Sequence, residues 1–385
     1  MHTLRKQPIN LNELETPCLV LDARRMDHNV ERLRARLGLL GPRLRVHLKT
    51  AKSVEVAQRV MSDPRDPITV STLREAEVFA DAGITDILYA VGIAPHRLDR
   101  VVALRRKRVD VSIILDSLEQ ASSVVAKVRE TGDAIPALIE VDCDGHRGGL
   151  RHGDPVLIET GRILHEGGAI LRGVMTHAGG SYGCVGADEL EAAAENERST
   201  AVACAEALRG AGLPCPVISV GSTPTAHFAR ALTGVTEVRA GVFMFFDLVM
   251  AGIGVCALDD IALSVLCTVV GHQRDRGWVL VDAGWMALSR DRGTARQAID
   301  QGYGVVCDIQ GRPFPDLIVA QANQEHGIVT VRDGSCAFLP DLPIGTRLRI
   351  LPNHACATGA QHEKYHVVED DSLTVREMWS RFGGW

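Results

Sequence analysis

The chain has 385 residues, of which 46% are hydrophobic and 23% charged, and this length suits two domains or one large barrel with an appendage. A net charge of −6 gives no basic surface for nucleic acid or for an anionic membrane. No apolar run approaches the ~20 residues of a membrane-spanning helix, and the start lacks the apolar core of a secretory signal. The cysteines form no close disulfide framework. We therefore expect a cytoplasmic protein whose cysteines are reduced thiols.

The first apolar run, "TPCLVLD" at residues 16–22, has two open interpretations. It adds a strand to a later β-rich domain, or it leads directly into the first helix.

From about residue 44, short β-branched or apolar runs alternate with segments of helical periodicity. The runs are "LRVHLKT" (44–50), "ITVST" (68–72), "ILYAVG" (87–92), "DVSIILD" (110–116), "ALIEVDC" (137–143), "RGVMTHAGG" (172–180), "PVISVGST" (216–223) and "TEVRAGV" (236–242). Such alternation implies parallel strands joined by right-handed crossovers. Eight units favour an α/β fold with an N-terminal (β/α)8 barrel. A doubly wound sheet is the competitor, but "HLKTAKS" is no glycine fingerprint for it.

After about residue 250 the pattern changes to strands joined by Gly, Asp and Pro turns, as in "GWVLVDAGW" and "GIVTVRDG". We therefore assign residues 24–250 to the barrel, and residues 1–23 and 251–385 to a C-terminal β domain.

Active sites of barrels lie just past the carboxyl ends of the strands. The polar residues at these positions are Lys49, Ser71, Thr72, Asp142, Arg147, His177 and the Gly221–Ser222–Thr223 turn. Loops are generally polar. This rim, however, combines a lysine, a histidine, an arginine and a Gly-Ser-Thr turn, which is more than loop polarity alone explains.

The segment "VISVGSTPTA" (217–226) ends a strand and starts a helix, which suits phosphate binding through small residues and the positive helix end. An ordinary helix cap is the alternative. Lys49 ends the first run, and a lysine facing a phosphate site suggests a Schiff base with pyridoxal 5′-phosphate. A solvated rim lysine is the alternative for Lys49.

Near the C-terminus, "PNHACATGAQH" places His354 and Cys356 two residues apart. In an extended segment these side chains point the same way and could share one metal ion. Two ligands leave a site open, and open sites do chemistry. The alternative is that the two residues lie close in the sequence by coincidence, and the pair alone does not exclude this.

Several segments together resemble the metal-activated, pyridoxal-phosphate-dependent D-3-hydroxyamino-acid lyases, which include D-serine dehydratases, hydroxyaspartate dehydratases and D-threonine aldolases. They are "TPCLVLD", "RVHLKTAKS", "TLREAEVFADAGITDILYA", "VDAGWMALSRDRG", "NQEHG" and "PNHACATG". The resemblance covers nearly the whole chain, and "SVGSTPTA" and "GWMALSRDRGTARQ" are most similar to the hydroxyaspartate dehydratases. It implies an alanine-racemase-like fold (fold type III of pyridoxal-phosphate enzymes).

Carried over residue by residue, the resemblance makes Lys49 the Schiff-base lysine, assigns the phosphate to Gly221, Ser222 and Thr223, and assigns the metal to His354 and Cys356. Zn2+ suits a thiolate ligand best, while Mn2+ or Co2+ could substitute.

The cofactor ring is expected to contact Arg147 at the pyridine nitrogen and His177 against its face. A surface ion pair is the alternative for Arg147, and an ordinary strand-end residue is the alternative for His177. The family often has a tyrosine at the position of Phe243. The phenylalanine in this chain lacks the hydroxyl that such a tyrosine places near the phosphate. Tyr182 is then the candidate tyrosine of the pocket, with ordinary packing as its alternative.

The resemblance implies a dehydratase that converts a D-3-hydroxyamino acid, such as D-threo-3-hydroxyaspartate or D-serine, to a 2-oxo acid and ammonia. Lys49 takes the α-proton, and the metal assists departure of the hydroxyl. A D-threonine aldolase is the first alternative, but family members with that activity tend to have aspartate in place of Cys356. An alanine-racemase-type isomerase and a non-enzymatic pyridoxal-phosphate carrier are further alternatives.

The substrate's distal carboxylate has three candidate partners, Arg290, Arg292 and Arg296, in "SRDRGTAR". An exposed charged loop explains them equally well. Folds of this type place the active site near a partner subunit, so we expect a homodimer.

Overall fold

The computed structural model describes residues 9–63, 65–370 and 372–385. The first eight residues, where we looked for a secretory signal, lie outside this part. Contacts divide the chain into two compact units: Glu31–Gly241 with Gly383–Trp385, and the chain up to Val30 with Val242–Phe382. Helix α1 (Ala23–Leu40) contains the first boundary between them.

The first unit contains a closed barrel of eight parallel strands. They are β3 (Arg43–His47), β4 (Ile68–Val70), β5 (Asp86–Gly92), β6 (Asp110–Leu115), β7 (Pro136–Val141), β8 (Ile170–Thr176), β9 (Val217–Val220) and β10 (Glu237–Ala240). The ring closes where β10 pairs with β3, with Val238 opposite Leu44. The (β/α)8 fold expected from the strand–helix alternation is confirmed.

The barrel strands share an apolar cluster of four buried side chains. Leu88, Ile114, Leu138 and Met175 form this cluster and are each at most 2% exposed. These residues come from four neighbouring strands, so the residues two positions further along each strand face the same interior nearer its carboxyl end. This register defines which side chains reach the mouth of the barrel.

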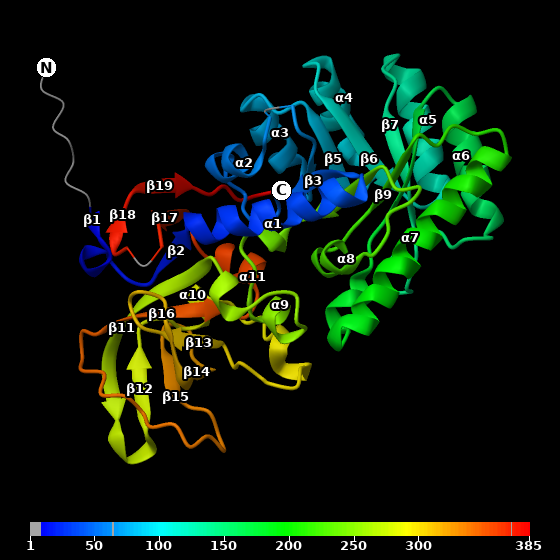
Figure 1. The fold of residues 1–385 in the computed structure, drawn as a ribbon. Helices are drawn as coiled ribbons and strands as arrows, with labels where there is room; N and C mark the ends of the chain where they lie inside the picture. Colours follow the sequence, from blue (N-terminus) through cyan, green and yellow to red (C-terminus); the bar gives the residue numbers. More distant parts are fainter. Residues whose placement is uncertain (1–8, 64, 371) are drawn as a thin grey trace, which may run out of the picture. The chain divides into compact units, whose positions relative to one another are not determined.

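Helices surround the barrel strands (Figure 1). They are α2 (Val54–Val60), α3 (Leu73–Asp81), α4 (Leu98–Arg106), α5 (Leu118–Thr131), α6 (Pro155–Glu166), α7 (Gly186–Gly210) and α8 (Thr223–Phe228). Thr72 and Ser117 begin α3 and α5, and each hydroxyl accepts a hydrogen bond from the backbone N–H of the third helical residue. Gly132 ends α5 in the left-handed conformation with φ of 73°.

The second unit is built on a nine-stranded sheet in the order β12-β15-β14-β13-β16-β11-β2-β17-β19. Its strands are β2 (Cys18–Asp22), β11 (Leu263–Gln273), β12 (Trp278–Val281), β13 (Gly304–Cys307), β14 (Pro313–Ala322), β15 (Gly327–Val331), β16 (Arg347–Pro352), β17 (Lys364–Val368) and β19 (Glu377–Ser380). A two-stranded ribbon pairs β1 (Ile9–Asn10) with β18 (Thr374–Val375). This unit also contains three short helices: α9 (Leu248–Gly252), α10 (Trp285–Leu288) and α11 (Ala355–Gly359).

Strand β2 resolves the two interpretations of "TPCLVLD", because both apply. The strand pairs with β11 and with β17 inside the sheet, and α1 begins directly after it at Ala23. All five residues of β2 are buried, which explains why Cys18–Leu21 are apolar without alternation; the fifth residue, Asp22, is a buried carboxylate.

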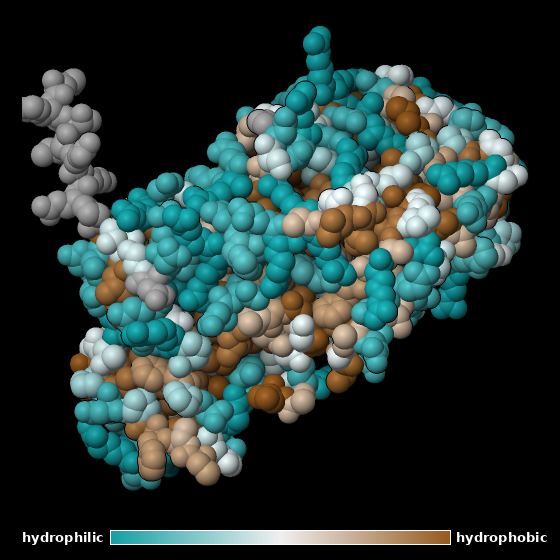
Figure 2. All heavy atoms as spheres, viewed as in Figure 1, coloured by the Kyte–Doolittle hydropathy of each residue, from teal (hydrophilic) through white to brown (hydrophobic). Residues whose placement is uncertain are grey.

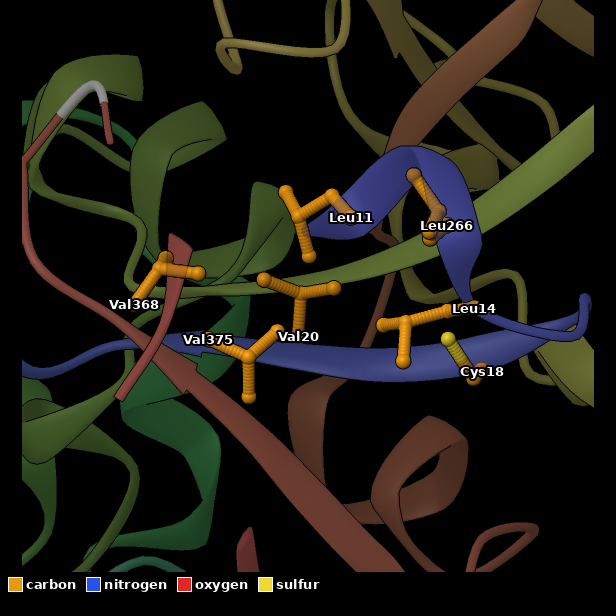
Figure 3. Packing of buried hydrophobic residues seen from close by; sticks show 7 residues of the cluster. All are labelled: Leu11, Leu14, Cys18, Val20, Leu266, Val368 and Val375. Atoms are coloured by element: carbon orange, nitrogen blue, oxygen red, sulfur yellow. The ribbon is translucent and has the colours of Figure 1, made fainter. Parts of the chain in front are cut away.

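The N-terminal segment also contributes to a buried core in this unit. Leu11 and Val20 pack with Leu266 of β11 and with Val368 and Val375 near the C-terminus, and their side chains converge in Figure 3. Segments from both ends of the chain therefore form one hydrophobic cluster.

Hydrophilic residues cover much of the face in view in Figure 2. Within the described residues, no helix is both long enough and apolar enough to cross a bilayer.

Candidate active site

Lys49 lies in a turn two residues beyond the end of β3, and its side chain is exposed. The sequence placed Lys49 at the end of the first strand, but β3 ends at His47, so Lys49 belongs to the turn that follows. His47 is the last residue of β3, and its Nε2 lies 3.0 Å from Ser71 Oγ. Burial, together with the nearby charges of Lys49 and Arg239, lowers the pKa of His47 well below its usual value. A neutral imidazole therefore lies close to an accessible amine.

The Gly221–Ser222–Thr223 turn joins β9 to α8, and Gly221 takes a conformation that favours glycine. Its φ is 140°, and a Cβ atom there would lie 2.0 Å from the carbonyl oxygen of Arg239. Ser222 begins α8, and its Oγ accepts from the Thr225 N–H at 3.2 Å. Thr223 Oγ1 is buried without a hydrogen-bond partner among the described residues. A ligand oxygen would satisfy that hydroxyl.

Glu197 of α7 stabilises this turn through hydrogen bonds. Its Oε1 accepts from the backbone N–H groups of Gly221 and Ala178, both at 2.9 Å, and its Oε2 accepts from Thr225 Oγ1 at 2.7 Å. Burial raises the pKa of Glu197, although these hydrogen bonds oppose the shift. The Gly221 N–H is already bonded, and Ser222 Oγ lies 2.9 Å from Ser181 Oγ and 3.0 Å from Thr225 Oγ1. Gly221 and Ser222 therefore shape the turn, and Thr223 Oγ1 is its hydroxyl without a partner among the described residues.

We did not select Glu197 from the sequence, although a signal exists. It falls on the buried stripe of α7, whose other members are Leu190, Ala194, Ala201, Cys204, Ala205 and Leu208. A carboxylate on such a stripe requires hydrogen-bonding partners inside the protein.

His177 follows β8, and its Nδ1 lies 2.9 Å from the Gly221 carbonyl oxygen. Burial lowers the pKa of His177 to about 3, despite the hydrogen bond to Gly221, and Arg239 lowers it further. The ring of Tyr182 lies 6.2 Å from the His177 ring at 52°. Tyr182 is 37% exposed. The two rings and the Gly221 turn therefore lie together in the barrel unit.

Arg147, which we expected to contact the cofactor ring, is largely exposed to solvent. Its side chain is 61% exposed, and its Nη2 lies 3.5 Å from Oε1 of the mostly buried Glu140. Burial raises the pKa of Glu140, while Arg147 opposes the shift. Arg239 is by contrast almost fully buried, and its guanidinium donates to Ser219 Oγ and to the Thr176 carbonyl oxygen.

His354 and Cys356 lie at the start of α11 in the other unit, where they are not on one face of an extended segment as we expected. Strand β16 ends at Pro352, His354 begins the helix, and Cys356 lies in its first turn. The Thr358 N–H donates to the His354 carbonyl oxygen, which closes that turn. The two side chains are nevertheless in contact, because a hydrogen bond joins them.

Asp291 is the strongest polar neighbour of His354, and the sequence did not suggest it. Its Oδ2 lies 2.6 Å from His354 Nδ1. Although burial lowers the pKa of His354, the hydrogen bonds to Asp291 and Cys356 raise it to about 11. Nothing in the spacing of Asp291 and His354, 63 residues apart, signals the contact.

The three arginines considered for a distal carboxylate have different surroundings. Arg290 is exposed and stacks over Trp285, at 4.5 Å from the ring centre. Arg292 pairs with Asp300 at 2.5 Å. Arg296 is exposed at the end of a short 3-10 helix.

The residues in the two units fit the two groups that the sequence suggested. An exposed amine, a glycine turn and an unsatisfied threonine hydroxyl suit a phosphorylated carbonyl cofactor. One nitrogen and one sulfur donor suit a thiophilic divalent ion with open coordination positions.

Comparison with known proteins covers both units. Residues 21–249 match the family described as alanine racemase, N-terminal domain, and residues 262–368 match the putative serine dehydratase domain. D-threo-3-hydroxyaspartate dehydratase of Delftia sp. (strain HT23) is 56% identical over 97% of this chain and 98% of its own length. D-serine dehydratase of Dictyostelium discoideum is 28% identical over 96% of this chain and 97% of its own length.

Two solved structures of D-threo-3-hydroxyaspartate dehydratase variants are also similar, each at 55% identity. A histidine-to-alanine variant has a TM-score of 0.95 and covers 98% of this chain and 97% of its own. A cysteine-to-alanine variant in the metal-free form has a TM-score of 0.94 and covers 98% of this chain and 100% of its own. The two substituted positions in that protein are two residues apart.

Proposed function

This chain belongs to the family of D-threo-3-hydroxyaspartate dehydratase, built on the alanine racemase fold, and we propose that it is a pyridoxal-phosphate- and metal-dependent dehydratase. Its substrate is a D-3-hydroxyamino acid, and the products are a 2-oxo acid and ammonia. The similarity that carries this proposal extends over 97% of the chain at 56% identity and so includes both units. Dehydratase rather than aldolase activity is proposed because Cys356 stands where aldolases of this family tend to have aspartate.

When bound, pyridoxal phosphate supplies an electron sink for charge at Cα, and a divalent cation supplies a Lewis acid for the leaving hydroxyl. Gly221, Ser222 and Thr223 would hold the phosphate, with Thr223 Oγ1, which is buried without a partner among the described residues, as the donor and Gly221 leaving room for it. Lys49, whose amine is accessible, would hold the cofactor covalently, and its Nζ would take the proton from Cα once the substrate amine has replaced it.

His354 and Cys356 would hold the cation. Because His354 Nδ1 is bonded to Asp291, its Nε2 is the nitrogen left for a metal. The thiolate of Cys356 favours Zn2+, and Mn2+ or Co2+ could replace it. His177, a neutral imidazole, would contact the cofactor ring, and Tyr182 and Arg147 would line the same pocket.

Product analysis tests the proposal. The purified protein, supplied with pyridoxal phosphate and Zn2+, is incubated with D-threo-3-hydroxyaspartate, D-serine or D-threonine. A 2-oxo acid and ammonia support the dehydratase, while glycine and an aldehyde would establish an aldolase instead. Activity that survives complete removal of metal by a chelator would contradict the role of His354 and Cys356, and bound cofactor without any turnover would favour a carrier.

A matched pair of lysine variants tests the cofactor attachment. Lys49→Ala should abolish both the Schiff-base absorbance and turnover, because the variant lacks the amine that forms the Schiff base with the cofactor. Lys52→Ala removes a nearby lysine that pairs with Glu75 at 3.3 Å, and it should keep both. Full absorbance in the Lys49→Ala variant would overturn the assignment.

A cytoplasmic homodimer is part of the same proposal. The ten cysteines are free, Cys336 is exposed, and five others are buried, which suits a reducing compartment. Light scattering on the purified protein would measure twice the mass of one chain, and the mass of one chain would contradict the dimer.

A further inference from the structure

The orientation of His354 depends on which of its two ring nitrogens is already engaged. Nδ1 lies 2.6 Å from Asp291 Oδ2, a distance typical of a charge-assisted hydrogen bond. An aspartate at that position fixes both the ring plane and the tautomer. The lone pair of Nε2 is then the one directed away from Asp291.

The backbone that carries Asp291 is strained. Ser289, two residues earlier, has φ of 73° and ψ of 167°, a region used almost entirely by glycine. Ser289 is only 6% exposed, and its Oγ accepts from the Asp291 N–H at 3.1 Å. Thr358 Oγ1 of α11 donates to the Leu288 carbonyl oxygen at 2.8 Å. The strained turn is therefore tied to the helix that carries Cys356.

The residues on either side of His354 are fixed as well. Asn353 is 1% exposed, donates to Thr294 Oγ1 and to the Gly302 carbonyl oxygen, and accepts from the Thr294 N–H. The buried carboxylate of Asp247 accepts from the Ala355 N–H at 2.9 Å. These bonds hold the backbone at His354, whereas the hydrogen bond to Asp291 acts on the imidazole itself.

We propose that Asp291 is a positioning residue that holds the His354 imidazole with Nε2 available to the cation. This inference rests on the dehydratase function proposed above. Backbone strain beside a functional side chain is expected where the strain serves a site. Carboxylate partners of metal-binding histidines typically change metal affinity by about 10–100-fold when they are removed.

Metal affinity, rather than turnover, tests the proposal. Asp291→Leu and Asp291→Asn have nearly the same shape, but only asparagine keeps an oxygen that accepts from Nδ1. We expect the leucine variant to bind Zn2+ about 10–100-fold more weakly in competition with a chromophoric chelator. The asparagine variant should recover most of the affinity. Asp308→Leu is the control, because it removes a carboxylate of the same unit that pairs with Arg312 at 2.7 Å.

A cobalt spectrum provides a second readout that does not require catalysis. The thiolate-to-cobalt charge-transfer band should persist in all variants, and the d–d bands of the leucine variant should shift as the nitrogen ligand is lost or displaced. Wild-type Zn2+ affinity and an unchanged cobalt spectrum in a folded leucine variant would overturn the role of Asp291. If the leucine variant does not fold, Asp291→Ala takes its place in the same comparison. A wild-type protein that binds neither metal would instead overturn the proposed function.

Discussion

Glu197 shows how a buried carboxylate organises the Gly221 turn. Its oxygens accept from two backbone N–H groups and from Thr225 Oγ1. Replacing it by alanine removes the acceptor of all three donors, and each buried N–H group left unsatisfied costs about 1–3 kcal/mol. We expect Glu197→Ala to weaken pyridoxal phosphate binding at least about tenfold, since distortion of the turn by 1.4 kcal/mol already has this effect. Absorbance titration of cofactor-free protein would measure it.

Two comparisons make this expectation specific. Glu197→Gln keeps an acceptor for both backbone donors and should stay within a few-fold of wild type. Glu206→Ala, on the exposed side of the same helix, should have no effect. Equal cofactor affinity in the alanine variant and wild type would show that the turn holds its shape without Glu197.

Asp291 marks the limit of sequence reasoning at the scale of residues. The pair His354 and Cys356 was found because two metal-binding side chains lie close in sequence, whereas Asp291 reaches His354 across 63 residues. Only the fold brings them together. Lys49 was found through its position after a strand, but its exposure depends on where that strand ends.

At the scale of elements, the turn between β9 and α8 depends on the absence of a side chain. A Cβ at Gly221 would lie 2.0 Å from the carbonyl oxygen of Arg239 on the neighbouring strand β10. With φ of 140°, Gly221→Ala should destabilise the protein by about 1–3 kcal/mol and weaken cofactor binding. Urea unfolding and cofactor titration would measure the two effects.

The matched control lies at the end of α7. A Cβ at Gly210 meets nothing within 4 Å, so Gly210→Ala should leave cofactor binding unchanged. Should both variants bind and unfold alike, the close approach of β9 and β10 would not restrict residue 221.

Most strands could be predicted because buried parallel strands are short, apolar and separated by amphipathic helices. Their ends were less accurate. The run at 216–223 contains a strand only from Val217 to Val220, because Gly221 leaves the β conformation. The segment after β16 was expected to be extended, but hydrogen bonds from Ala355 to Asp247 and from Thr358 to His354 turn it into a helix. Apolar pattern predicts the strands, while such tertiary bonds decide where they end.

At the scale of the molecule, the sheet of the second unit is completed by the N-terminal segment. Leu266 of β11 packs with Leu11, Val20 and Val375 and is fully buried (Figure 3). Leu266→Ala should therefore reduce the free energy of unfolding by about 2–5 kcal/mol. Leu39→Ala, at a position 89% exposed, should change it by less than about 0.5 kcal/mol. Equal denaturant midpoints for the two variants would contradict the packing.

The acid stability of the whole protein should depend on a charged layer inside the barrel. Glu237 of β10 accepts from Arg45 Nε at 2.9 Å and from Arg43 Nη2 at 3.0 Å, and Arg45 also pairs with Asp86 at 2.8 Å. Burial alone would raise the pKa of Glu237, but the two arginines hold it below its usual value of 4.5. A carboxyl whose pKa is lowered by folding stabilises the protein above the unfolded value and loses this contribution as the pH falls through the folded value.

Comparison of Glu237→Gln with wild type at several pH values isolates this contribution. At pH 7 the glutamine variant should be less stable by about 1.5–3 kcal/mol, because Arg45 loses one of its two carboxylate partners and keeps Asp86. Below about pH 4.5 the difference should shrink, because Glu237 of the unfolded wild type takes up a proton there and the folded wild type follows only at lower pH. Glu195→Gln removes an exposed partner of Arg198 and should change stability by about 0–1 kcal/mol. A Glu237→Gln difference that stays constant down to pH 3 in urea unfolding would mean that the charge of Glu237 does not stabilise the barrel.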